Sequence, residues 1–239
     1  MGATELIVAA VVTLAGFMRG VTGFGGAMLM APPMSLLLGP VAAVVTALLL
    51  ETAAALVMVR DAWPKIGRAT LLYLTVPACI TVPVGGQLLL SLDPGLTRKA
   101  IATVVVIFSF ALLLGFRYSG SPRPVTSLAL GSVVGLLLGA TSIGAPPVIL
   151  YLLSGPDPAA VTRANLTVFI TVISAIGVVM LMAAGAVTGE LVTMAAMLTI
   201  PYLVATWLGG RVFAKLNDFG ARWFALGLTL ASGIVGLAL

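Results

Sequence analysis

The sequence predicts an all-α polytopic membrane protein of two inverted repeats, each a broken-helix hairpin followed by three transmembrane helices. Three observations predict this fold. Of the 239 residues, 61% are hydrophobic and 8% are charged, whereas soluble domains carry about 25% charged residues. The apolar runs are continuous and close to the length of a membrane span, unlike the short alternating strands of a β-barrel. Two stretches rich in glycine and proline interrupt these runs at corresponding places in the two halves.

The apolar segments are separated by short polar or turn-forming loops, none of them long enough for a soluble domain. The segments cover residues 4–38, 41–59, 69–91, 100–116, 125–154, 159–184, 191–214 and 221–239. Pro77 to Leu114 aligns without a gap on Pro201 to Ala238, so that the pair Gly85-Gly86 meets the pair Gly209-Gly210. The expected units are therefore a first membrane repeat (1–116), a polar linker (117–124) and a second membrane repeat (125–239).

The first segment of each repeat is too long for one upright helix. At 1.5 Å per residue, residues 4–38 would measure about 52 Å and residues 125–154 about 45 Å, against a hydrocarbon core of about 30 Å. The first contains Gly20-Val-Thr-Gly-Phe-Gly-Gly and the second contains Gly139-Ala-Thr-Ser-Ile-Gly. Each segment is expected to break there into pieces too short to cross comfortably, as a tilted broken helix or as a hairpin that returns to its own side.

Loop charge favours the hairpins. If the first segments crossed the membrane, the basic residues would divide almost evenly between its two sides. With hairpins, the inside holds Arg60, Lys65, Arg68, Arg117, Arg123, Arg163, Arg211, Lys215 and Arg222, and the outside holds Arg98 and Lys99. That distribution follows the positive-inside rule. The two halves are then inverted, and both termini lie outside.

The two broken stretches form the expected substrate site. Irregular backbone at membrane depth is tolerated where it is buried in protein or lines a wet cavity. Its N–H groups and the positive end of the next helix suit a small anion, and paired breaks of this kind point to a transporter's binding site. The candidate residues are Arg19, Gly20, Thr22, Gly23, Gly25, Gly26, Gly139, Thr141, Ser142, Gly144 and Asn165. The alternative for the small residues is helix packing, which we also expect of the two Gly-Gly pairs.

Three polar residues leave alternatives open. Arg19, just before the first break, could bind sulfonate, sulfite or carboxylate oxygens, form an ion pair with Glu51, or extend toward an interface. Glu51 lies near the middle of segment 41–59 and could carry a coupling proton or serve as that ion-pair partner; the corresponding region near Val168 is apolar. Asn165 could line the pathway or bond to a neighbouring helix.

Composition argues against several other functions. The chain has no His and one Cys, Cys79, which argues against haem, zinc and thiol-pair chemistry; no cofactor and no metal site are expected. There is no nucleophile–base set, so an enzyme is not expected. The net charge of +5 comes from short loops and is explained by topology, so no nucleic-acid partner is expected. The expected partners are a small anion and the lipid bilayer, and long apolar faces are compatible with a homodimer.

At these residues the sequence resembles the TauE/SafE family of sulfite exporters, also called the toluenesulfonate uptake permease family. The resemblance rests on Gly20 to Pro32, Gly139 to Pro147, Thr162-Arg-Ala-Asn-Leu-Thr167, and the Gly-Gly helices before Ser91-Leu-Asp-Pro94 and Lys215-Leu-Asn-Asp218. It implies a bacterial inner-membrane carrier of small sulfur-containing anions, driven by an ion gradient. One departure matters: Gly25-Gly26 becomes Gly144-Ala145-Pro146 in the second copy, so the two breaks need not contribute equally.

The expected function is secondary transport of sulfite or organosulfonates such as sulfoacetate, by alternating access, with the site at the two glycine-rich hairpin tips. Two alternatives stay open. One is a non-transporting membrane scaffold or assembly factor, in which the tips are packing motifs. The other is a transporter of another small ion or metabolite, including a cation bound by Glu51 and backbone carbonyls.

Overall fold

A computed structural model describes residues 2–116, 118, 123–155, 157–213 and 218–238 of the chain. The helices are α1 (Ala3–Thr22), α2 (Gly26–Leu38), α3 (Pro40–Ala62), the 3-10 turn η1 (Trp63–Lys65), α4 (Arg68–Ser91), α5 (Pro94–Leu113), α6 (Pro124–Thr141), α7 (Ala145–Leu152), α8 (Ala159–Ala183), α9 (Gly189–Phe213) and α10 (Asp218–Ala238). These ranges contain no strand. Arg117, Lys215 and most of the expected polar linker lie outside the described residues.

The chain is a polytopic helical membrane protein. In the described part of the chain, seven helical stretches are long and apolar enough to cross a bilayer; they lie in α1, α3, α4, α5, α6, α8 and α9. Helix α2 and residues Ala225–Ala238 of α10 are shorter apolar helices. The exposed side chains along these helices are largely hydrophobic, as expected where the surrounding solvent is lipid.

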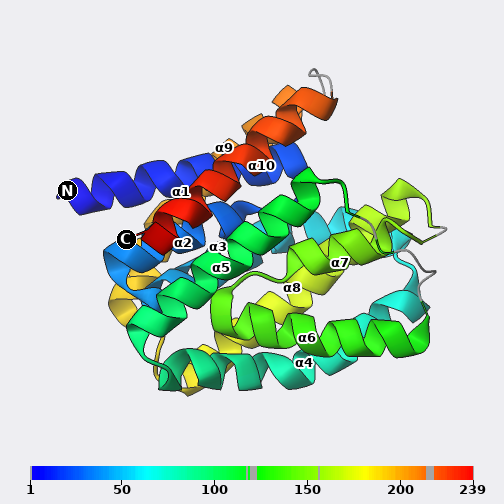
Figure 1. Cartoon of the computed structure of the whole chain (residues 1–239), viewed down its shortest axis with the longest axis horizontal. Coiled ribbons are helices and arrows are strands. Elements are labelled where there is room, and N and C mark those ends of the chain that lie inside the picture. Colours follow the sequence, from blue (N-terminus) through cyan, green and yellow to red (C-terminus); the bar gives the residue numbers. More distant parts are fainter. Residues whose placement is uncertain (1, 117, 119–122, 156, 214–217, 239) are drawn as a thin grey trace.

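The two expected breaks are present. Helix α1 ends at Thr22 and α2 begins at Gly26; helix α6 ends at Thr141 and α7 begins at Ala145. One expectation about length was wrong, because α1 (20 residues) and α6 (18 residues) are each long enough to cross a membrane by themselves. The N-terminal end of α1 protrudes beyond the neighbouring helices (Figure 1). A long α1 can therefore still end deep inside the protein.

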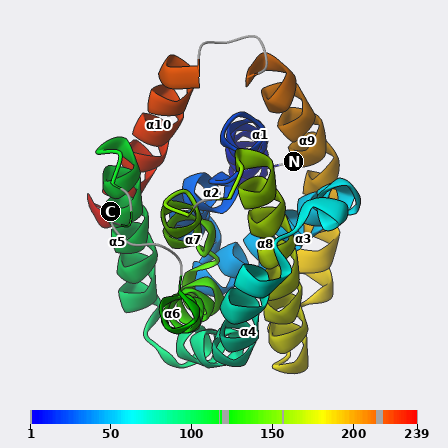
Figure 2. The same ribbon diagram turned by 90° about the vertical axis from the view of Figure 1, so that its right-hand side faces the viewer.

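Successive helices alternate in direction. In Figure 1, α1, α3, α5, α7 and α9 run from left to right, and α2, α4, α6, α8 and α10 run back. The chain therefore reverses at each break, and α1 and α6, the first helices of the two halves, run in opposite directions. Helices α3 and α9 end, and α4, α6 and α8 begin, toward the same end of the molecule. Figure 2 views that end and shows α2 and α7 surrounded by the longer helices.

The first helix of each half packs against the fourth helix of the other half. Helix α6 lies along α4, and α1 lies along α9; α3 also packs on α8, and α5 on α10. Glycine makes the two close pairs possible. A Cβ on Gly139 would lie 2.7 Å from the backbone nitrogen of Gly86, and a Cβ on Gly20 would lie 2.8 Å from that of Gly210. A Cβ on Gly85 or Gly209 would likewise collide with a backbone carbonyl oxygen, so each Gly-Gly pair contains a packing position, as expected.

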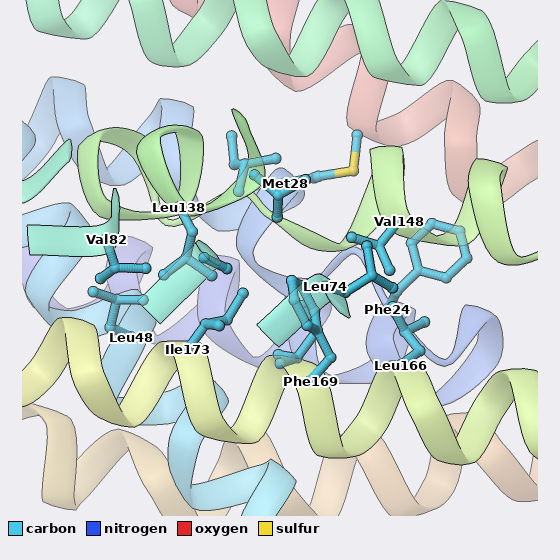
Figure 3. Close-up of a cluster of buried hydrophobic side chains, with 14 of the residues drawn as sticks. Phe24, Met28, Leu48, Leu74, Val82, Leu138, Val148, Leu166, Phe169 and Ile173 are labelled. Carbon is cyan, nitrogen blue, oxygen red and sulfur yellow. The ribbon is translucent and has the colours of Figure 1, made fainter. Parts of the chain in front are cut away.

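A shared hydrophobic core fixes the breaks. Phe24, from the first break, and Ile143, from the second, are both buried in the larger core cluster. Phe24 lies close to Val148 of α7 and Leu166 of α8, while Met28 and Leu138 lie farther along the same cluster (Figure 3). Side chains from the second half thus hold the first break in place, and the two halves fold as one core.

Candidate functional site

The two breaks adopt the same type of backbone turn. After α1, Gly23 adopts a left-handed conformation with φ of 78°, and its N–H donates to the Arg19 carbonyl at 2.7 Å. After α6, Ser142 does the same with φ of 61°, and its N–H donates to the Leu138 carbonyl at 2.7 Å. The left-handed region favours glycine. Ser142 is the one non-glycine residue with positive φ among the described residues.

The two matching threonines hold these turns in the same way. The Thr22 hydroxyl donates to the Met18 carbonyl at 2.9 Å, and the Thr141 hydroxyl donates to the Leu137 carbonyl at 2.6 Å. Each threonine oxygen also accepts from the N–H two residues later, that of Phe24 or Ile143, at 3.3 Å. The hydroxyls expected to serve a ligand thus have partners within their own turns, and their role in binding stays a prediction.

Gly20 and Gly139 lie in the tight helix pairs. A methyl group on Gly20 would collide with the Thr206 carbonyl of α9, and one on Gly139 with the Val82 carbonyl of α4. The structure therefore gives both glycines the packing role that the sequence left open. Gly25 and Gly26 differ, because they stand at the start of α2 with no side-chain cap on its first N–H groups.

Arg19 and Glu51 form an ion pair between α1 and α3. The guanidinium Nη1 contacts the Glu51 carboxylate, and both side chains are 6% exposed. The hydroxyl of Tyr202, on α9, donates to the same carboxylate at 2.7 Å. A Cβ on Gly26 would lie 2.7 Å from Glu51 Oε1 and would also meet the Tyr202 hydroxyl. Glu51 stands near the middle of α3, so this cluster lies level with the middle of that helix.

An open cleft of about 590 Å³ reaches Arg19 from one side. Its charged lining residues are all basic: Arg163 of α8 and Arg211 of α9 as well as Arg19. The Arg211 guanidinium lies over the Trp207 ring, 3.7 Å from its centroid. Gly20, Thr22 and Gly23, where α1 ends, also line the cleft, and the rest of the lining is largely apolar and comes from α3, α7, α8 and α9. The cleft has the charge and size for a small organic anion.

A second, much smaller cavity of about 20 Å³ lies between the two breaks and is also lined by Arg19. The N-terminal residues of both short helices line it: Ala27 and Met28 from α2, and Ala145 and Pro146 from α7. Helices α2 and α7 run away from it in opposite directions (Figure 1). Its volume suits about one water molecule. Arg19 lines both the cleft and the cavity, and so stands between them.

The comparisons with known proteins bear on this arrangement. The model of the family described as sulfite exporter TauE/SafE matches residues 8–236, nearly the whole chain. The chain belongs to the TauE/SafE sulfite exporter family. The search of curated proteins and the search of solved structures gave no match.

In this TauE/SafE protein the cavity is chemically asymmetric. The register that aligns Gly20 with Gly139 places Leu138 opposite Arg19 and Ile170 opposite Glu51, and all four residues line the cavity. Both charges therefore come from the first half of the chain. The prolines at 146 and 147 have no N–H to donate, so the start of α2 is the richer source of backbone donors.

Asn165 lies apart from the other candidates. It is fully buried, and its side-chain oxygen accepts from the N–H of Gly67 at 2.8 Å, where α4 begins. It lines neither the cleft nor the cavity. Of its two expected roles, the structure shows the bond to a neighbouring segment. Within the described residues there is no group of three or more His, Cys, Asp or Glu that could hold a metal ion.

Two residues of this TauE/SafE site were not predicted. Tyr202 bonds to Glu51 from α9, and Ser174 lines the cavity from α8. Both stand in long apolar segments that showed no polar stripe. For Tyr202 a signal was available, because a buried phenol usually finds a hydrogen-bond partner. A lone serine in a membrane helix carries no such signal.

Proposed function

We propose that this TauE/SafE protein is a secondary transporter of small sulfur-containing anions, sulfite or organosulfonates such as sulfoacetate, in the inner membrane. The observation that carries the proposal is the position of Arg19. This buried guanidinium lines both the large cleft and the small cavity between the two breaks. A group that faces both compartments can receive an anion from one and pass it to the other.

The cleft would collect the anion. Arg163 and Arg211 lie on its wall, and basic residues in a low-dielectric cleft raise the local concentration of anions. At its inner end the anion would meet Arg19, whose planar guanidinium fits two oxygens of a sulfonate or sulfite. The uncapped N-terminus of α2 would add backbone donors and a positive dipole end.

Glu51 would couple the anion to a proton. In this structure the Glu51 carboxylate pairs with the Arg19 guanidinium, so an arriving anion must displace the carboxylate. Protonation would cancel the Glu51 charge and release the guanidinium. The titratable groups in contact with Glu51 are Arg19 of α1 and Tyr202 of α9, while α2 and α8 face the cavity with apolar or small residues. One proton would then move with each anion.

Inverted repeats would supply alternating access. Opposite directions of α1 and α6, and the matched pairing of α6 with α4 and α1 with α9, support this part of the proposal. Rocking of one half against the other would close the present cleft and open a path on the opposite side. The cavity, which lies between the two breaks, would remain at the centre.

A thermal-shift screen of the purified protein tests the substrate. A ligand that binds the folded state raises the melting temperature by mass action. We expect sulfite or sulfoacetate to raise it in a concentration-dependent manner, and taurine, sulfate and simple carboxylates to raise it less. If none of the sulfur-containing anions raises the melting temperature, the proposal is contradicted. If cations alone raise it, the alternative cation site at Glu51 is favoured.

A further inference from the structure

Ser174 is a buried hydroxyl without a partner. The side chain is 1% exposed, and its Oγ makes no hydrogen bond within the part of the chain that the structure describes. Serine and threonine in helices usually donate to the carbonyl four residues earlier. Thr171, one turn earlier on α8, does so at 2.7 Å from the Thr167 carbonyl. An unmade hydrogen bond on a buried polar group is costly, and this one borders a cavity.

Two further groups converge on the same cavity. Arg19 lines it and has an Nε that makes no hydrogen bond to any described residue. The start of α2 lines it through Gly25, Ala27 and Met28, and the first N–H groups of a helix have no intrahelical partner. The cavity is thus lined by donors from three helices, α1, α2 and α8, together with the Glu51 carboxylate that pairs with Arg19.

The three sources of donors match the three oxygens of a sulfonate. Arg19 and the α2 backbone both come from the first half, where the break carries Gly25-Gly26. The second break offers fewer donors, because Pro146 and Pro147 at the start of α7 have no N–H. The Ser142 hydroxyl, which also lines the cavity, already donates to the Thr141 carbonyl. Ser174, on α8, is a donor from the second half of the chain that lines the cavity.

We infer that Ser174 is a specificity-determining residue, whose hydroxyl donates to the third oxygen of a sulfonate or sulfite bound between the two breaks. The inference rests on the proposed function. A cavity of about 20 Å³ holds no such anion, so the head group enters as the breaks move apart during the transport cycle. A carboxylate has two oxygens and leaves Ser174 without a partner, which is how the site distinguishes the two classes.

The test compares sulfoacetate with malonate, two dianions that differ in having a sulfonate or a carboxylate at one end. In full-length protein, Ser174→Ala should weaken sulfoacetate binding about tenfold, the loss expected for one hydrogen bond to a charged group. Malonate binding should stay within about twofold. The melting temperature without ligand should be unchanged or higher, because the hydroxyl removed had no partner.

Ser109→Ala is the matched control. Ser109 is also fully buried, but its hydroxyl donates to Thr229 at 3.1 Å and joins α5 to α10, and neither residue lines the cavity. This variant should lower the melting temperature and leave sulfoacetate affinity unchanged. Equal sulfoacetate affinity in wild type and Ser174→Ala, or equal losses for both ligands, would overturn the inference and leave the proposed function standing. A wild-type protein that binds neither sulfite nor sulfoacetate would overturn both.

Discussion

Arg19 connects the local structure to the proposed function. It lies at the end of α1, pairs with Glu51 of α3, and lines two compartments. The sequence predicted that this residue needs a partner, because a charge at membrane depth is expensive. The sequence alone did not decide whether that partner is the ligand or Glu51. That choice depends on how α1 is rotated and how far it slides along α3, and neither is encoded locally.

Glu51→Gln tests the ion pair. Glutamine can still accept from Tyr202, but it leaves the buried Arg19 without a counter-charge, and breaking a buried pair in this way costs about 3–5 kcal/mol. We expect a lower melting temperature without ligand and a larger shift with sulfoacetate, since the anion now supplies the missing charge. Tyr202→Phe is the control: it removes one hydrogen bond and keeps the pair. A sulfoacetate shift smaller than in wild type would contradict this role.

Removing Arg19 tests the ligand contact. Arg19→Ala alone should sharply weaken sulfonate binding, but it also strands the Glu51 carboxylate. The double variant Arg19→Gln with Glu51→Gln removes both charges and should recover much of the stability without recovering the affinity. Calorimetry in detergent measures both variants. Unchanged sulfoacetate binding would leave Arg19 with a structural role alone.

At the scale of helices, segment length and composition predicted the breaks, because glycine-rich stretches favour a turn within an apolar run. The equivalent turns at Gly23 and Ser142 follow from that duplication. The inward positions of Ser174 and Tyr202 could not be predicted. Helices α8 and α9 are apolar on nearly every face, so no polar stripe distinguishes the lipid side from the core side. The length of α1 was misjudged because part of it protrudes.

Neighbouring glycines on α9 test the helix packing. A Cβ on Gly209 would collide with the Phe17 carbonyl of α1, whereas one on Gly210 would meet only the Gly20 carbonyl at an ordinary 3.8 Å. Gly209→Ala should therefore destabilise the protein by about 1–3 kcal/mol, the usual cost of overpacking. Gly210→Ala should change little. Thermal unfolding in detergent measures both, and equal effects would contradict the geometry.

At the scale of the whole molecule, the orientation in the membrane follows from loop charge. In a Cys79→Ser background, the cysteine in each of the single-cysteine variants Lys65→Cys and Asp157→Cys should be protected from a membrane-impermeant maleimide in intact cells. Lys99→Cys should react, because the α4–α5 connection is expected outside. If both first segments crossed the membrane instead, Lys65 and Asp157 would lie on opposite sides. Labelling of one of them without the other would therefore contradict the hairpin topology.

The most direct test of the central claim is sulfoacetate and sulfite flux in proteoliposomes. We expect the wild-type protein to carry one of these anions faster than protein-free liposomes do, and to carry it faster under an applied proton gradient. The double variant Arg19→Gln with Glu51→Gln, reconstituted at the same density, should carry none above background. Folded wild-type protein that moves neither anion, or a double variant that moves them as fast as wild type, would contradict a transporter whose site lies between the two breaks.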